Sequence, residues 1–261
     1  MLGTGAKVMP MKAMVLAAGL GTLLLPLTND RPKALVEING RTLLEITLTR
    51  LKSFGIREVI INVHHFAAMV VEYLKANQNF GMSIEVSREE TLLDTGGGLK
   101  KASWFFLRDR DKANRGPAAA GAVFILHNVD VISTIDLKRM VQSHQANGAL
   151  ATLAVQDRKT SRYLLFNQQK ELCGRRFVKE GKTELVRNAK PSYELAFSGI
   201  HVISTRLLNL MTEEGIFSII DVYLRLAAQG EKIKSFSADE YDWRDLGTPE
   251  SVRAAEELRD Q

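Results

Sequence analysis

Short apolar runs alternate with amphipathic segments through the first half of the chain. Residues 12–17, 58–63, 83–86 and 122–126 form short, largely apolar runs that predict strands. The segments 42–54, 66–76, 99–107 and 135–145 carry apolar residues at near-helical spacing. Because strand and helix follow one another repeatedly, this half predicts a mostly parallel sheet covered on both faces.

The second half has a different pattern. Residues 149–155, 163–166, 195–203 and 232–236 predict strands, and residues 167–170 predict a turn. Helices are predicted at 216–228 and from Thr248 to about residue 259, since Thr248 suits an N-cap and Pro249 the first turn. We therefore expect an α/β fold with a single mixed, mostly parallel central sheet flanked by helices. Its antiparallel additions come in the second half.

The composition is that of an ordinary globular domain, with 45% hydrophobic and 25% charged residues. Cys173 is the only cysteine, which excludes an intrachain disulfide and a cysteine-rich zinc site. The net charge of +5 is mild and gives no nucleic-acid footprint. We expect residues 1–11 to form a loose leader and residues 12–261 a single domain.

One uncharged stretch, residues 13–29, superficially looks like a signal peptide. Two glycines and Pro26 interrupt it, and no small-residue cleavage site follows. It is also too short and too broken to span a membrane. We therefore expect a cytoplasmic protein with no membrane partner.

A glycine-rich loop follows the first predicted strand, with the sequence AAGLGT at residues 17–22. Glycines allow backbone N–H groups to approach a phosphate with no side chain in the way. A nicotinamide-binding loop would need a small third residue in GxGxxG and a helix behind it, and Leu24 and Pro26 argue against both. The sequence also lacks a P-loop motif. Taken alone, the two glycines are equally compatible with a simple tight turn.

Further motifs follow in a fixed order. The loop continues as L-x-P-L-T and then P-K-x-L up to residue 35. DTGGG comes at 94–98, NVD at 128–130, FSGI at 197–200 and WRDLGTPE at 243–250. Over residues 12–258 this series resembles the nucleotide-sugar pyrophosphorylases, which are sugar-1-phosphate nucleotidyltransferases of GT-A-like Rossmannoid fold. It is most similar to the short bacterial members without an added acyltransferase domain, such as the N-acetylmuramate-1-phosphate uridylyltransferases.

The resemblance implies a reaction and its substrates. A sugar 1-phosphate attacks the α-phosphorus of a nucleoside triphosphate and pyrophosphate leaves, with Mg²⁺ as cofactor. This chemistry needs alignment and charge neutralisation more than covalent catalysis. Residues 12–145 would bind the nucleotide and residues 146–261 the sugar. The base, the sugar and the oligomeric state stay open.

The resemblance also assigns the site residues. Asp130 and Asp245 each follow a strand-like segment, and as metal ligands they would converge at one sheet edge. Lys33 would hold phosphate as a point charge and completes the catalytic set with the two aspartates. The nucleotide-binding residues would be Ala18, Gly19, Leu20, Gly21, Thr22, Lys33, Gly96 and Gly97, and the sugar-binding residues Asn128 and Gly199.

The chain departs from the family pattern at one important position. Leu23 stands where the family has its catalytic arginine, and Leu25 where a second arginine is frequent. Loss of such a charge-assisted donor costs on the order of 10²–10⁴ in rate. Either another cation, with Arg31 the nearest, takes over, or nucleotide binding persists with weak or absent turnover. We expect both leucines to pack against the protein.

A separate segment, residues 157–160 (DRKT), could contact a sugar phosphate, but it fits a solvated loop better.

Overall fold

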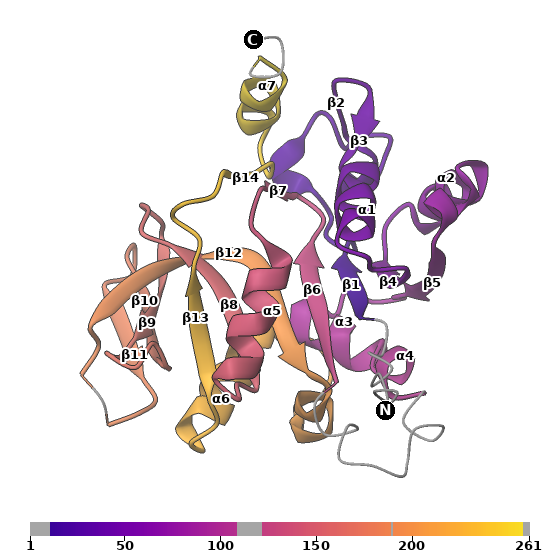
Figure 1. The fold of residues 1–261 in the computed structure, drawn as a ribbon. Coiled ribbons are helices and arrows are strands. Elements are labelled where there is room, and N and C mark those ends of the chain that lie inside the picture. The colour runs from indigo at the N-terminus through magenta and orange to yellow at the C-terminus, as the bar shows by residue number, and fades with distance from the viewer. Residues whose placement is uncertain (1–10, 109–121, 189, 258–261) are drawn as a thin grey trace, which may run out of the picture.

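A ten-stranded mixed sheet runs through the computed structural model, which describes residues 11–108, 122–188 and 190–257 (Figure 1). One path of paired strands has the order β11-β10-β9-β12-β6-β1-β4-β5, and β8 pairs with both β12 and β13. The strands are β1 (Lys12–Leu16), β4 (Glu58–Val63), β5 (Ser83–Arg88), β6 (Val123–Asn128), β8 (Ala151–Gln156), β9 (Arg162–Phe166), β10 (Leu172–Phe177), β11 (Lys182–Leu185), β12 (Tyr193–Ser204) and β13 (Ile233–Ser237).

Strand direction changes at the centre of this sheet. β1 lies parallel to β4 and β6, and β4 lies parallel to β5. β12 is antiparallel to β6, β8 and β9, and the hairpin strands β10 and β11 continue in the same manner. The predicted fold class is confirmed, with a parallel first half and antiparallel additions in the second.

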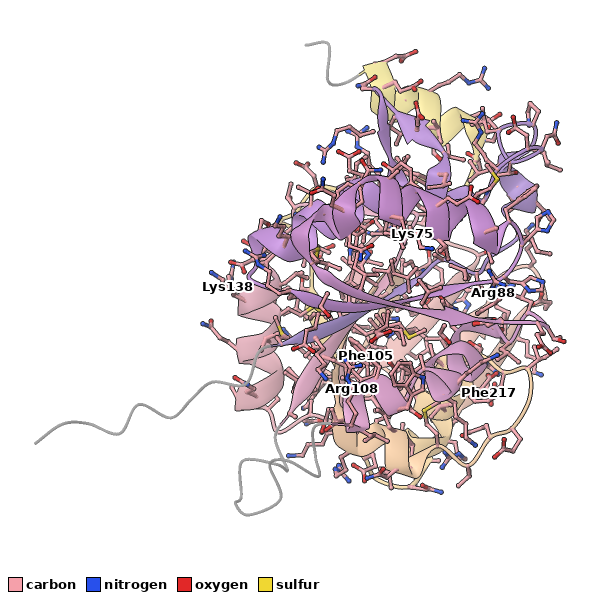
Figure 2. The ribbon with its side chains drawn as sticks, turned by 90° about the vertical axis from the view of Figure 1, so that its right-hand side faces the viewer. Lys75, Arg88, Phe105, Arg108, Lys138 and Phe217 are labelled. Atoms are coloured by element: carbon pink, nitrogen blue, oxygen red, sulfur yellow. The ribbon has the colours of Figure 1, made fainter. Side chains whose placement is uncertain are left out.

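Helices cover both faces of the sheet. They are α1 (Leu43–Ser53), α2 (Ala67–Ala76), α3 (Asp94–Lys101), α4 (Trp104–Leu107), α5 (Leu137–Ala146), α6 (Ile219–Ala228) and α7 (Pro249–Glu257), with 3-10 turns η1 (Thr22–Leu24), η2 (Lys33–Leu35), η3 (Gln78–Gly81) and η5 (Thr205–Leu210). Along β1, Val15 belongs to the core cluster that includes α1 and α2, whereas Met14 belongs to the one that includes Phe105 and α6. This alternation is what a strand buried on both faces requires. Figure 2 shows Lys75 of α2 and Phe105 of α4 on opposite sides of the sheet.

Two small antiparallel sheets lie outside the main one. β2 (Glu37–Ile38) pairs with β3 (Arg41–Thr42), and β7 (Val131–Ser133) pairs with β14 (Trp243–Asp245). The second pair ties the C-terminal segment to the chain directly after β6. It therefore brings together the two motifs that contain Asp130 and Asp245.

Some element boundaries differ from those predicted. The single helix expected at 99–107 is two helices, α3 and α4, and α3 already begins at Asp94. The helix expected from residue 216 begins at Ile219, because the Ser218 hydroxyl accepts a hydrogen bond from the Ile220 amide at 3.2 Å and caps it. β10, β11 and the two small sheets were not predicted. Apart from Met11, the leader expected at 1–11 lies outside the described residues. Among the residues that the structure describes, no helix is long and apolar enough to cross a membrane.

Candidate active site

The glycine-rich loop leaves the carboxyl end of β1 and turns back sharply at Gly21. Gly21 has a left-handed φ of +68°, and a Cβ there would lie 2.9 Å from Thr28 and 3.3 Å from Lys33. The Thr28 hydroxyl donates to the Gly21 carbonyl at 2.8 Å, and so does the Leu24 amide. The turn therefore needs a glycine, and it packs the loop against the backbone that carries Lys33.

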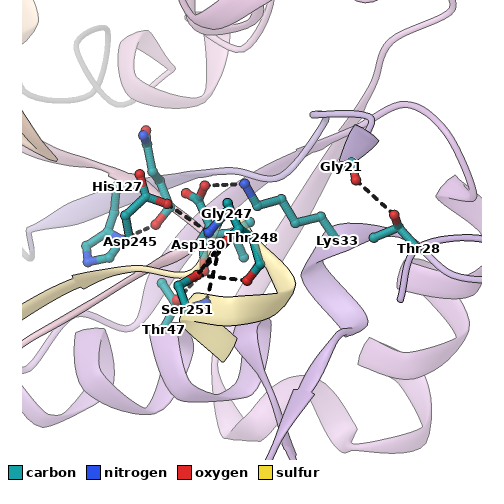
Figure 3. A network of polar contacts seen from close by, with 12 residues as sticks. Gly21, Thr28, Lys33, Thr47, His127, Asp130, Asp245, Gly247, Thr248 and Ser251 are labelled. Carbon is teal, nitrogen blue, oxygen red and sulfur yellow. Dashed lines mark hydrogen bonds and ion pairs between the residues drawn. The ribbon is translucent and has the colours of Figure 1, made fainter. Parts of the chain in front are cut away.

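Lys33 is aimed at Asp130. It opens the 3-10 turn η2, directly after Pro32, whose fixed φ stiffens the approach. Its ammonium group forms an ion pair with the Asp130 carboxylate, and the two side chains are only 17% and 19% exposed. Figure 3 shows the lysine side chain extending from its own loop to this carboxylate. Such burial shields the pair from solvent and makes the interaction less sensitive to salt than a surface pair.

Asp245 joins this pair through the small sheet. In the β14–β7 register it lies opposite Val131, and the Leu246 amide donates to the Asp130 carbonyl at 2.8 Å. One Asp245 carboxylate oxygen accepts from the Gly247 amide at 2.8 Å. Burial, followed by the charge of Asp130, raises the pKa of Asp245, while the positive charge of Lys33 opposes the rise. The two carboxylates are therefore close enough to repel each other.

The donor set fits a magnesium ion. Asp130 and Asp245 supply two hard carboxylate ligands whose mutual repulsion a divalent cation would relieve. Within the described ranges, no group of three or more His, Cys, Asp or Glu side chains forms a complete protein cage. Magnesium is commonly held by one or two carboxylates, with phosphate oxygens and waters completing the shell. The pair is therefore suited to a metal that arrives with a phosphorylated substrate.

Asn128 and Gly199 lie next to each other beside this carboxylate pair. Asn128 ends β6, and Gly199 sits in an irregularity of β12 where the register with β8 shifts. Gly199 has a φ of +73°, and a Cβ there would lie 2.8 Å from Val131 and 3.0 Å from the Asn128 amide nitrogen. The structure thus brings the two predicted sugar-binding positions together.

Gly96 and Gly97 lie in the first turn of α3. Their amides both donate to the Phe217 carbonyl, at 2.9 and 3.2 Å. A Cβ on Gly96 would lie 2.5 Å from the Phe217 ring, and one on Gly97 2.5 Å from the Gly215 carbonyl oxygen. Close packing of α3 on residues 215–217 therefore accounts for both glycines. Their approach to a nucleobase stays a prediction.

A buried polar network missed in the sequence supports the start of the glycine-rich loop. The Asn62 side chain accepts from the Ala17 amide at 2.8 Å and donates to Glu89 at 2.7 Å. Glu89 is 2% exposed and also accepts from the Leu93 amide at 2.9 Å, just before α3. A polar residue inside the apolar run EVIINV was the available signal for Asn62.

The expectation that Leu23 and Leu25 pack against the protein is wrong. They are 76% and 51% exposed, because η1 turns both side chains away from the core and buries Leu24 instead. Arg31, the nearest cation in sequence, forms an ion pair with Asp30 at 2.9 Å and lines a pocket with Pro249 of α7. Its described contacts are thus with Asp30 and not with Lys33 or Asp130.

Comparisons with known proteins give a consistent result. The nucleotidyl transferase family matches residues 12–261. An N-acetylmuramate alpha-1-phosphate uridylyltransferase of Caulobacter vibrioides is 32% identical over 95% of this chain and 96% of that protein. A UTP–glucose-1-phosphate uridylyltransferase of Synechocystis sp. and a mannose-1-phosphate guanyltransferase of Pichia angusta are 27% and 30% identical over 91% and 92% of this chain. This chain spans only 60% and 61% of those two proteins.

Solved structures support the fold. A putative glucose-1-phosphate thymidylyltransferase from Bacillus anthracis has a TM-score of 0.73 at 18% identity, covering 95% of this chain and 94% of that one. A UDP-glucose pyrophosphorylase in complex with UDP-glucose has a TM-score of 0.72 at 16% identity, covering 97% and 99%. At such low identities the likeness concerns the fold alone.

Proposed function

The chain belongs to the nucleotidyl transferase family, and on this premise we propose that it transfers a nucleotidyl group from a nucleoside triphosphate to a sugar 1-phosphate. The products are a nucleoside diphosphate sugar and pyrophosphate. The observation that carries the proposal is the meeting of Lys33, Asp130 and Asp245, which come from three separate segments. Two repelling carboxylates and a lysine form a site that suits polyphosphate chemistry.

Each residue has a distinct part in the proposed reaction. Asp130 and Asp245 would hold Mg²⁺, which supplies neutralisation of phosphate charge when bound. Lys33 binds a phosphate oxygen and keeps the reacting groups in line. The loop from Ala18 to Thr22 contacts the triphosphate through its backbone, with Gly96 and Gly97 beside the base. Asn128 and Gly199 border the sugar.

The first substrate pair to test is UTP with N-acetylmuramate 1-phosphate. The relative from Caulobacter vibrioides, which matches over nearly the whole length of both chains, supports this pair. Guanosine triphosphate with mannose 1-phosphate is second, because guanyltransferases are also among the relatives. Since these substrates are cytoplasmic metabolites, we propose a cytoplasmic location.

The test is pyrophosphate release with Mg²⁺ from a panel of nucleoside triphosphates and sugar 1-phosphates. We expect turnover by the wild type and a loss of at least about 10²-fold in Asp130→Asn and Asp245→Asn. Asp136→Asn is the matched control, because the Asp136 side chain caps α5, asparagine caps equally well, and its charge acts on Arg50 and Arg139 and not on the two site aspartates. The absence of turnover for every pair would contradict the proposal.

A second function follows from Leu23. With no arginine at this position, the protein would bind nucleotide or nucleotide sugar without efficient turnover and act by binding alone. Calorimetry separates the two functions, since tight UTP or UDP-sugar binding without pyrophosphate release favours the second. The absence of both binding and turnover contradicts each of them.

A further inference from the structure

Arg158 lies flat against an aromatic ring beside the candidate active site. Its guanidinium carbon is 3.9 Å from the centre of the Trp243 ring, and its terminal nitrogen donates to the Phe197 carbonyl at 2.8 Å. The Trp243 indole in turn donates to the Ser198 carbonyl at 2.8 Å. Two successive carbonyls of β12 thus fix the arginine and the ring on which it stacks. This is an ordered side chain and not a solvated loop residue.

The position of Arg158 connects it to the reaction centre. Trp243 and Asp245 are alternate residues of β14, so both side chains lie on the same face of that strand. The positive charge of Arg158 is among the influences that hold down the pKa of Asp245. The carbonyls that hold Arg158 and Trp243 belong to Phe197 and Ser198, the two residues before Gly199, the predicted sugar-binding position. Arg158 therefore belongs to the sugar side of the carboxylate pair.

The charge of Arg158 has no anionic partner within the ranges that the structure describes. No carboxylate there lies within ion-pairing distance of it, and its Nε is buried without a hydrogen-bond acceptor. Burial lowers the pKa of Arg158, and only the more distant Asp245 and Tyr163 oppose this. A partly buried guanidinium charge without an anionic partner is unfavourable. An anionic ligand would relieve this cost.

We propose that Arg158 binds the phosphate of the sugar 1-phosphate substrate and sets its orientation for attack. The inference rests on the proposed function and specifies which residue recognises the acceptor phosphate. A guanidinium offers five N–H donors in a planar fork that matches phosphate oxygens, and here one face and one donor are already used for anchoring. Nε is buried, so the remaining donors on the terminal nitrogens are the ones available for the ligand. Lys33 and Arg158 would then each bind a phosphate beside the two aspartates.

Steady-state kinetics with separate variation of the two substrates tests this assignment. UTP and N-acetylmuramate 1-phosphate are used, or the pair that the panel turns over best. In Arg158→Met we expect KM for the sugar phosphate to rise roughly 10- to 100-fold, with KM for UTP within about twofold of the wild type. Arg158→Lys keeps the charge but loses the fork, and an intermediate KM is expected. Lys159→Met removes the same charge from the adjacent exposed residue, and it should leave both constants unchanged.

The outcomes distinguish the inference from the function on which it rests. If the wild type turns over a pair but Arg158→Met leaves KM for the sugar phosphate unchanged, the inference alone is overturned. An equal rise in both KM values would indicate a structural role and overturns it too, and melting curves of Arg158→Lys and Arg158→Met identify misfolding. A rise in KM for UTP alone would place Arg158 at the triphosphate and would also overturn the inference. No turnover by the wild type refutes the proposed function together with the inference.

Discussion

Restoring the missing arginine, in the variant Leu23→Arg, is the sharpest perturbation that the structure offers. Leu23 is 76% exposed, so its replacement removes almost no buried apolar contact. The free energy of unfolding should change by no more than about 0.5 kcal/mol, as for most surface substitutions. Position 23 lies in the turn η1, which begins directly after Gly21, and Gly21 packs against Lys33, the residue proposed to bind phosphate.

The expected gain in activity follows from one charge-assisted interaction. A hydrogen bond from a guanidinium to a phosphate oxygen contributes about 1.5–3 kcal/mol. If it forms in the transition state, kcat/KM rises roughly 10- to 150-fold. Pyrophosphate release at subsaturating nucleotide measures this gain. Leu185→Arg is the matched control, because Leu185 ends β11, is 52% exposed and receives the same charge away from the loop.

Two results would refute this reasoning. A folded Leu23→Arg enzyme with kcat/KM no higher than the wild type would mean that the absent guanidinium does not limit the reaction. An equal gain in Leu185→Arg would mean that the added charge acts through general attraction of the anionic substrates. Activity that appears only in Leu23→Arg would instead favour a wild-type protein that binds without turnover.

Three further predictions concern stability. Gly97→Ala should lower the free energy of unfolding, measured in urea, by about 1–3 kcal/mol, because its Cβ would lie 2.5 Å from a backbone carbonyl oxygen. In the control Gly19→Ala the new Cβ meets no atom within 4 Å, so this variant should lose less stability. Equal losses in the two variants would contradict the close packing at Gly97. The pKa of Asp245 is raised in the folded state, so above that pKa its charge destabilises the folded protein. Asp245→Asn should therefore have a higher melting temperature than the wild type in metal-free buffer at neutral pH. A lower melting temperature would contradict this. Burial lowers the pKa of His127 and His144 to about 4 and that of His201 to about 3. The unfolded state therefore binds more protons below pH 6.5, and the free energy of unfolding should fall by up to about 3 kcal/mol per histidine toward pH 4. A urea midpoint that stays constant over that pH range would refute this prediction.

The sequence predicted best those elements whose side chains are buried on both faces. β4 (EVIINV) is almost wholly buried, so an apolar run alone identifies it. β10 was missed because Arg175 and Arg176 interrupt its apolar pattern. In the fold Arg175 pairs with Glu184 of the neighbouring β11, and Arg176 pairs with Glu194 of β12, which lies beyond β9, so charge pairing replaces apolar alternation.

The residues of the candidate site likewise include some that the sequence predicted and others that it could not. Lys33, Asp130 and Asp245 stand in motifs with fixed spacing, and the prediction that the aspartates meet at one sheet edge depends only on where strands end. The stacking of Arg158 could not be predicted, because burial of a charged side chain depends on Trp243, which is distant in sequence. The exposure of Leu23 could not be predicted either, since an apolar residue in a loop gives no indication of which way a short 3-10 turn will face.

The charge arrangement explains why such a site needs several chain segments. Asp130 and Asp245 repel each other, and burial adds to the cost of the Asp245 charge. Adjacent main-chain bonds between β7 and β14 hold them together, and Lys33 compensates only part of the repulsion. Carboxylates supplied by one flexible loop could move apart, whereas strand ends fixed by a sheet cannot. The fold thus maintains an unfavourable concentration of negative charge, and in the proposed function this concentration would favour the binding of a divalent cation together with its phosphates.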